Sequence, residues 1–190
     1  MLEAFSHTYT VLGIEPDSGA RELAKKKVQS GSIYESSASV KMQGTLVDVV
    51  TLFHVAEHFY DPSLELERIY ELLKPGGLLI IETPNSCDAL LTKYENLGFQ
   101  NFTYWSHHPI LHSHKSLSLL LARNGFKILE CGGVQRYDLN NHLYWLSKGM
   151  PGGHEIWKGM FSEDTIQSYG RDLVNNRTND TLWFVAQKTY

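Results

Sequence analysis

The stretch that most constrains the fold of this chain covers residues 46–85, which read LVDVVTLFHVAEHFYDPSLELERIYELLKPGGLLIIETPN. Residues 46–53 are apolar apart from Asp48 and Thr51, a pattern that predicts a parallel strand covered on both faces. Residues 78–82 predict a second buried strand. Parallel strands need a crossover connection, so the helical pattern between them predicts a right-handed βαβ unit.

The helix between these strands has clear start and stop signals. Asp61-Pro62-Ser63 predicts its start, because proline is pre-organised for the first turn and a small polar side chain accepts a free amide hydrogen. Apolar residues then recur at helical spacing from Leu64 to Leu73. Lys74-Pro75-Gly76-Gly77 ends the helix and turns the chain, since proline cannot continue the hydrogen-bond ladder and glycine accepts positive φ.

The carboxyl ends of the two strands carry the side chains of chemical interest. They are Phe53-His54 after the first strand and Glu82-Thr83-Pro84-Asn85 at the end of the second. Ligands of open α/β sheets bind outside the carboxyl ends of the strands. The sequence therefore predicts a ligand site at this edge of the sheet.

The segments DVVTLFHVAEHFYDP and LERIYELLKPGGLLIIETPN resemble the fourth and fifth strands of the class I S-adenosylmethionine (SAM)-dependent methyltransferases, in the branch with His-x-x-Glu-His after strand four. SLSLLLARNGFKILEC resembles the helix and sixth strand of the same family. The resemblance covers residues 2–126 and the last strand. It implies an α/β, Rossmann-like fold, with a mostly parallel sheet, helices on both faces and an antiparallel last strand.

The other expected elements follow the family's order. Residues 16–27 predict a helix capped by Asp17 or Ser18, with Leu23 and Ala24 facing inward. Ser113 is a plausible cap for a second helix. The remaining predictions are strands at 10–15, 31–34, 126–131 and 181–188 and a helix at 115–123.

One departure from the family concerns the start of the chain. The family begins with a strand and a glycine-rich loop, and no Gly-x-Gly precedes Glu15 here. The absent strand is normally central, between the strand ending at Glu15 and the strand at 46–53. We expect a single domain over residues 1–190, incomplete at its N-terminus. Either the chain is a fragment, or its sheet closes over the gap, or another chain fills it.

The resemblance implies a set of cofactor-binding residues. Glu15, at the end of its strand, is expected to accept hydrogen bonds from the ribose hydroxyls of SAM, with Pro16 beside it. Glu35 is expected near the adenine, and Phe53 and His54 are expected to flank the cofactor. The alternative for Glu15 is a strand-end carboxylate that faces water, and the alternative for the Glu35 region is an ordinary polar loop at residues 36–39.

Two histidines of the His54-Val-Ala-Glu57-His58 run are the expected catalytic residues. Imidazole is a suitable general base for a hydroxyl acceptor at neutral pH, and His54 and His58 are placed for that role. The run also fits a zinc peptidase signature, which needs a long helix, whereas Asp61 and Pro62 leave room for about one and a half turns. Some relatives with Glu in place of His54 use this turn for a divalent ion. The histidine argues against it, and the sequence predicts no metal site.

The composition argues against several kinds of binding partner. The net charge of −4 and the pI of about 6.1 argue against nucleic acid, which usually meets a basic face. Cys87 and Cys131 make no disulfide framework, and no apolar run is long enough to span a bilayer. We therefore expect a cytoplasmic protein without a membrane partner.

The expected activity is SAM-dependent methyl transfer to a small molecule, such as a sugar hydroxyl or another oxygen acceptor. Residues 135–179, which are rich in aromatic side chains, are interpreted as an insertion that covers the substrate, with packing helices on the sheet edge as the alternative. A second hypothesis is a non-catalytic module that does not bind cofactor alone. Either a homo-oligomer or a further N-terminal segment would complete the sheet.

Overall fold

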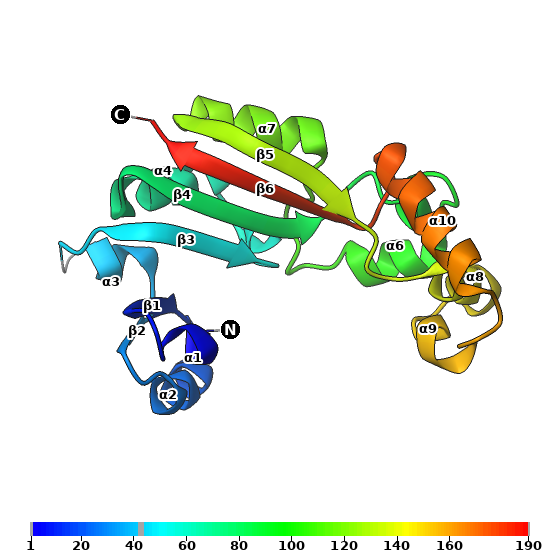
Figure 1. Ribbon diagram of the computed structural model, residues 1–190, viewed down its shortest axis with the longest axis horizontal. Helices are drawn as coiled ribbons and strands as arrows, with labels where there is room; N and C mark the ends of the chain where they lie inside the picture. Colours follow the sequence, from blue (N-terminus) through cyan, green and yellow to red (C-terminus); the bar gives the residue numbers. More distant parts are fainter. Residues whose placement is uncertain (1, 42–43, 190) are drawn as a thin grey trace.

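A computed structural model describes residues 2–41 and 44–189, so Met1 and Tyr190, the ends of the predicted domain, lie outside it. The described strands form two sheets (Figure 1). One sheet has the order β1-β2, and the other has the order β3-β4-β6-β5. Together with the helices they make the α/β, Rossmann-like architecture that the sequence predicts.

The βαβ unit is confirmed. Strand β3 (Val47–Phe53) pairs in parallel with β4 (Leu73–Pro84), and helix α4 (Pro62–Leu72) connects them. The side chain of Asp61 caps α4 by accepting a hydrogen bond from the amide of Leu64 at 3.0 Å. The helix thus begins at the predicted proline because its first amides are satisfied from the preceding residue.

The larger sheet continues as the resemblance implies. Strand β6 (Thr181–Lys188) lies antiparallel between β4 and β5 (Phe126–Val134). Helix α7 (His114–Arg123) begins at Ser113, which forms a capping box with Ser116. Helices α4 and α7 pack against the sheet in one apolar cluster, which includes Leu66, Leu79, Leu117, Leu121, Phe126 and Phe184.

The N-terminal segment forms a small unit of its own. Strands β1 (Val11–Ile14) and β2 (Gly31–Tyr34) pair in parallel, with α1 (Leu2–Phe5), α2 (Ser18–Lys27) and α3 (Ser37–Lys41) around them. Asp17 caps α2, as predicted. The prediction that Leu23 faces inward is wrong, because it is 62% exposed and α2 buries none of its side chains.

The break between the two sheets falls where the resemblance implies a central strand. No described strand joins β1 to β3. Strand β3 is therefore an edge strand, and Val49 is 47% exposed, contrary to the prediction of a strand covered on both faces. The apolar run at 46–53 has the composition of a central strand, but in this structure it has a neighbour on one side only.

The remaining helices gather near the carboxyl ends of β3, β4 and β5 (Figure 1). The insertion contributes three of them, so part of it does form helices. None of the described helices is both long and apolar enough to cross a bilayer. These elements are α5 (Ala89–Thr92), α6 (Leu97–Thr103), α8 (Leu139–Lys148), α9 (Gly153–Ile156), α10 (Glu163–Asn175) and the short 3-10 turn η1 (Ala56–His58).

Candidate functional site

A cavity of about 220 Å³ opens at the carboxyl ends of the strands. His54, Pro84 and Asn85 line it from the ends of β3 and β4. Leu90, Leu91, Phe99 and Phe102 give it an apolar side. Its other lining residues are Asp88, Thr103, His108, Arg136, Tyr137, Asn141, His142, Asp180 and Thr181.

His54 lies at the centre of a charged network. Its amide donates to the carbonyl of Glu82 at 2.8 Å, which extends the β3-β4 pairing by one residue. Its Nε2 lies 3.2 Å from Oε1 of Glu82, and its Nδ1 lies 3.4 Å from Oε1 of Glu57. The guanidinium of Arg136 also contacts its Nε2. With φ at 53°, His54 has a left-handed backbone conformation, which is costly outside glycine and gathers at functional sites.

The turn after β3 places Glu57 inside the protein and His58 outside it. Glu57 is 1% exposed, and its Oε2 accepts a hydrogen bond from the Thr83 hydroxyl at 3.0 Å. His58 is exposed, and its Nδ1 lies 2.5 Å from the carbonyl of His107. Because η1 has three residues only, His54 and His58 do not share a helix, which excludes the zinc peptidase alternative.

The chain after β5 builds the opposite wall of the cavity. Oδ2 of Asp180 accepts hydrogen bonds from the amides of Arg136 at 2.8 Å and Tyr137 at 2.9 Å. These bonds hold the segment that carries the Arg136 guanidinium towards His54. Burial raises the pKa of Asp180, although the two amides and Arg136 act in the opposite direction.

Two more buried groups next to the cavity have shifted pKa values. Burial raises the pKa of Asp88 to about 7, although the amide of Leu90 bonds to its carboxylate and lowers it. Burial lowers the pKa of His142 to about 4. His142 bonds through Nδ1 to the hydroxyl of Tyr169 at 2.8 Å and through Nε2 to Gln135 at 3.1 Å.

Sequence reasoning missed Arg136, Asp180 and Asp88 as site residues. Asp88 caps α5 and Asp180 lies just before β6, so both are close to predicted strand ends. Their closeness to strand ends could be read from the sequence, and it could have identified both residues as candidates for the site. Arg136 and Tyr137 fall within the predicted insertion, where no periodic pattern singled them out.

The predicted cofactor residues divide between the two sheets. Phe53 and His54 end β3, whereas Glu15 and Pro16 follow β1 and the exposed Glu35 follows β2. Oε1 of Glu15 accepts a hydrogen bond from the amide of Asp17 at 2.9 Å. All of these residues were predicted to contact one cofactor, yet the strands that they end or follow belong to two separate sheets. Figure 1 shows β1 and β2 below the amino-terminal half of β3, because no described strand bridges the two sheets.

Comparison with protein families finds that the model of the methyltransferase domain family matches residues 1–131. This segment includes both sides of the break between the sheets. The solved structure of a protein described as a putative methyltransferase from Bacillus halodurans superposes with a TM-score of 0.63 over 99% of this chain and 87% of that one, at 16% identity. At this level of identity the likeness concerns the fold.

Two curated relatives match over shorter segments. A protein named probable S-adenosylmethionine-dependent methyltransferase from Mycolicibacterium smegmatis is 35% identical over 48 residues, which are 25% of this chain and 19% of that protein. A ubiquinone biosynthesis O-methyltransferase from Chelativorans is 37% identical over 51 residues, or 27% of this chain and 20% of that protein. Each match thus spans about a fifth of the relative's length.

Proposed function

Since the chain belongs to the methyltransferase domain family, we propose that it transfers a methyl group from SAM to an oxygen atom of a small-molecule acceptor. The observation that carries this proposal is the position of His54. Its imidazole lies at the end of β3, lines a cavity of about 220 Å³ and is flanked by the carboxylates of Glu57 and Glu82.

In the proposed reaction the acceptor oxygen attacks the methyl carbon of SAM while the bond from that carbon to sulfur breaks. The acceptor proton passes to His54, and S-adenosylhomocysteine leaves. The sulfonium is already activated, so alignment and exclusion of water supply much of the catalysis. The Arg136 guanidinium, which contacts Nε2 of His54, would have to move aside before that nitrogen accepts the proton. Glu57 and Glu82 would then stabilise the protonated imidazole, and Phe99 and Phe102 would hold an apolar part of the acceptor. His58 stays a second candidate base.

The cofactor is proposed to bind between the two sheets. Glu15 would hold the ribose, with Pro16 beside it, Glu35 would lie near the adenine, and Phe53 and His54 would flank the nucleoside. Support comes from the position of each residue at the end of a strand or within two residues after it. Because the sheets are separate within the described chain, we expect this chain alone to bind SAM weakly. Micromolar affinity by calorimetry would contradict that expectation.

The separate sheets also favour a second candidate function, a methyltransferase-like module that binds no cofactor alone. Strands β1 and β3 each have one edge without a described partner strand. Such edges pair readily with another chain. We therefore expect the purified chain to associate, either with a second copy or with a further segment. A stable monomer in light scattering would count against this expectation.

One experiment separates the two candidates. SAM is titrated to millimolar concentration into the full chain, and transfer of a radiolabelled methyl group is followed to a panel of small hydroxyl compounds. We expect saturable binding that Glu15→Gln weakens, while Glu22→Gln, an exposed carboxylate on α2, leaves it unchanged. His54→Ala should keep the binding and lose the transfer. No saturation, or no effect of Glu15→Gln, would favour the non-catalytic module.

The setting of this activity is proposed to be the cytoplasm, without nucleic acid or a membrane as partner. Cys87 and Cys131 are both free thiols, which supports a reducing compartment. The acidic net charge of −4 supports the absence of a nucleic-acid partner.

A further inference from the structure

Two aspartates that the proposed reaction does not use line the cavity. Asp88 caps α5, and Asp180 lies directly before β6. Asp88 is 3% exposed, and the charge of Asp180 is close enough to raise its pKa. A carboxylate that is taken out of water is costly unless it is paired. Two of them at one cavity therefore call for a positive partner.

One oxygen of each carboxylate is left without a hydrogen bond from the described chain. Oδ1 of Asp88 accepts from the amide of Leu90 at 2.6 Å, and no described residue donates to its Oδ2. Oδ2 of Asp180 accepts from two backbone amides and from the side chain of Gln135 at 3.0 Å. Its Oδ1 is buried without a partner, since the Thr181 hydroxyl lowers the pKa of Asp180 but makes no hydrogen bond to that oxygen. Each aspartate can therefore accept one more donor.

The described side chains do not supply the positive charge that Asp88 calls for. Its pKa responds to burial, to one backbone amide and to Asp180, and to no basic side chain. His142 lines the same cavity, but burial lowers its pKa to about 4, so it is neutral at pH 7. Arg136 lowers the pKa of Asp180, but its guanidinium also lies 3.8 Å from Oε1 of Glu82. A cationic ligand would therefore meet an unbalanced negative charge beside Asp88.

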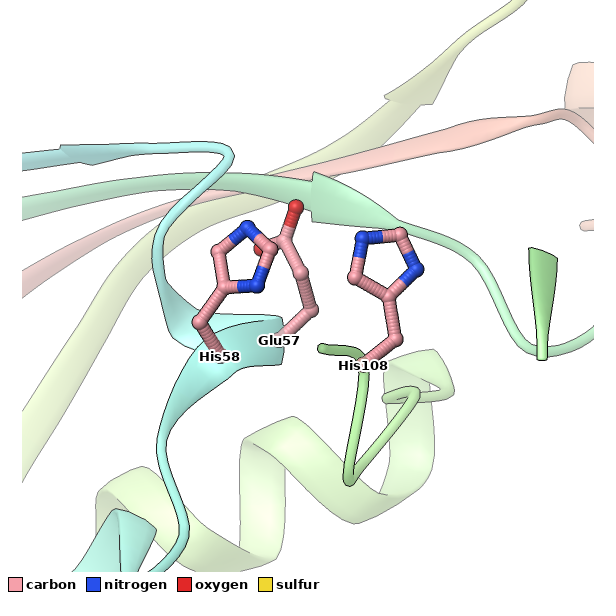
Figure 2. A group of neighbouring side chains, drawn as sticks. All are labelled: Glu57, His58 and His108. Atoms are coloured by element: carbon pink, nitrogen blue, oxygen red, sulfur yellow. The ribbon is translucent and has the colours of Figure 1, made fainter. Parts of the chain in front are cut away.

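A third buried carboxylate near the cavity, that of Glu57, shows what the two aspartates lack. Its Oε2 accepts a hydrogen bond from the Thr83 hydroxyl at 3.0 Å, and Nδ1 of His54 lies 3.4 Å from its Oε1. Figure 2 shows the imidazoles of His58 and His108 beside it, each with a nitrogen within 4.8 Å of a carboxylate oxygen. The chain itself thus surrounds this glutamate with partners, whereas each aspartate keeps one oxygen free.

The aromatic side of the cavity suits a cation with an apolar skeleton. Phe99 and Phe102 line it, with their ring centroids 6.3 Å apart. The face of an aromatic ring attracts a cation, and its area binds apolar groups. Because these rings and the two aspartates line the same cavity of about 220 Å³, one small ligand can contact both.

We propose that Asp88 binds an ammonium group of the acceptor, with the negative charge of Asp180 beside it. The substrate class is then a hydroxyl compound that also carries a primary or secondary amine on an apolar skeleton. An ammonium supplies both hydrogen-bond donors and positive charge to the free carboxylate oxygens, whereas a neutral hydroxyl supplies a donor only. That the bound amine is the methyl acceptor rests on the proposed function, whereas its binding does not.

The test measures binding of small probes to the full chain by calorimetry, so it does not depend on SAM or on methyl transfer. The probes share a phenyl group and differ in the charge of the other end: 2-phenylethylamine is a cation, 2-phenylethanol is neutral and phenylacetate is an anion. We expect the amine to bind at least about tenfold more tightly than the alcohol, and phenylacetate to bind most weakly. Equal affinity for the amine and the alcohol, or no binding of the amine at millimolar concentration, would overturn the proposal.

Substitutions with asparagine separate the charge of the aspartates from their shape. Asp88→Asn keeps an oxygen for the Leu90 amide, and Asp180→Asn keeps one for the amide of Arg136, but each removes a negative charge. Each should reduce the preference for the amine by about tenfold. Asp138→Asn is the matched control and should keep the preference, because Asp138 caps α8 in the same way but does not line the cavity. An unchanged preference in both Asp88→Asn and Asp180→Asn, with the fold checked by circular dichroism, would also overturn the proposal.

A second measurement distinguishes the ammonium site from the proposed function. In the radiolabelled transfer assay, an amino alcohol should be methylated faster than the diol with the same carbon skeleton. If the amine binds and no compound of the panel is methylated, the proposed function fails and the ammonium site stands. If diols are methylated as fast as amino alcohols, the ammonium site is wrong and the proposed function stands.

Discussion

The small β1-β2 unit and the four-stranded sheet obey the same local rules but bury very different amounts of apolar surface. In the four-stranded sheet, Leu79, Leu121 and Phe184 are each 0% exposed within one continuous cluster. In the small sheet, Val11 and Ile33 are the buried apolar strand residues. Since apolar burial is the main favourable contribution to folding, the small unit should open at a lower free energy than the rest.

This difference shows that a helix with clear start and stop residues does not necessarily bury side chains in the apolar core. Helix α2 has its cap at Asp17 and ends at the predicted Lys27, yet Leu23 is 62% exposed. Helix α7 has an equally good cap at Ser113, and it buries Leu117 and Leu121. Capping decides where a helix begins, whereas the sheet beside it decides how much it stabilises the protein.

The largest expected contrast comes from the same substitution in the two helices. Leu121→Ala should lower the free energy of unfolding by about 3 to 4 kcal/mol, because it leaves a cavity in a fully buried position. Leu23→Ala should change it by less than about 0.5 kcal/mol, since that side chain is already largely in water. Urea denaturation measures both. Equal losses would mean that the small unit is packed in solution in a way that this structure lacks.

Acid should destabilise the larger unit, because His142 is buried there and has to take up a proton at low pH. Its folded pKa of about 4 is below the ordinary 6.5, so its contribution is full above pH 6.5 and disappears as the pH falls towards 4. Between pH 7 and pH 4 the wild type should lose about 3 kcal/mol more stability than His142→Gln. Urea titrations across this range measure the difference.

Asp88 serves as a control, because its contribution to stability changes with pH in the opposite direction to that of His142. Its folded pKa of about 7 is above the ordinary 3.8, so its contribution is full below pH 3.8 and is lost as the pH rises through 7. Asp88→Asn should therefore make stability rise more steeply with pH, whereas His142→Gln should make it rise less steeply. If both variants keep the wild-type slope, neither group is buried in solution as described here.

A substitution at Gly31 should disrupt the small sheet without disturbing the four-stranded sheet. Its φ is 143°, and a Cβ there would meet the carbonyl oxygen of Val11 at 1.8 Å, so Gly31→Ala should separate β1 from β2. Gly159→Ala is the matched control, because Gly159 also has a positive φ, of 81°, but no atom within 4 Å. Hydrogen exchange should speed up over residues 11–34 and stay unchanged over β4 and β6. Faster exchange in β4 would show that the two units unfold together.

The smallest expected effect comes from the two helix caps. Asp17→Ala and Ser113→Ala each remove a side chain that accepts a backbone hydrogen bond, at a cost of about 1 kcal/mol to the helix. The Ser113 variant should show this loss in global urea unfolding, whereas the Asp17 variant should show only faster exchange within α2. A global loss from Asp17→Ala would make α2 part of the cooperative core.

The local order of elements was predictable because each signal lies within a few residues. Asp61 and Pro62 predicted the start of α4. The predicted turn at 74–77 is wrong in part, because β4 already begins at Leu73, although Gly76 has the positive φ of 76° that a glycine allows. The antiparallel position of β6 followed from the resemblance. The exposure of Val49 was not predictable, because it depends on which strand lies beside β3.

The sequence by itself determined the strands, the helices α2, α4 and α7, and the side chains that end β3 and β4, since alternation, caps and turn residues act between neighbours in the chain. Only the tertiary structure decided that Glu15 and His54 lie on separate sheets, that Asp180 bonds the amides beside Arg136, and that His108 joins Glu57. Those outcomes depend on contacts between residues dozens of positions apart. The chain forms such contacts through packing of the whole sheet, and no local pattern encodes them.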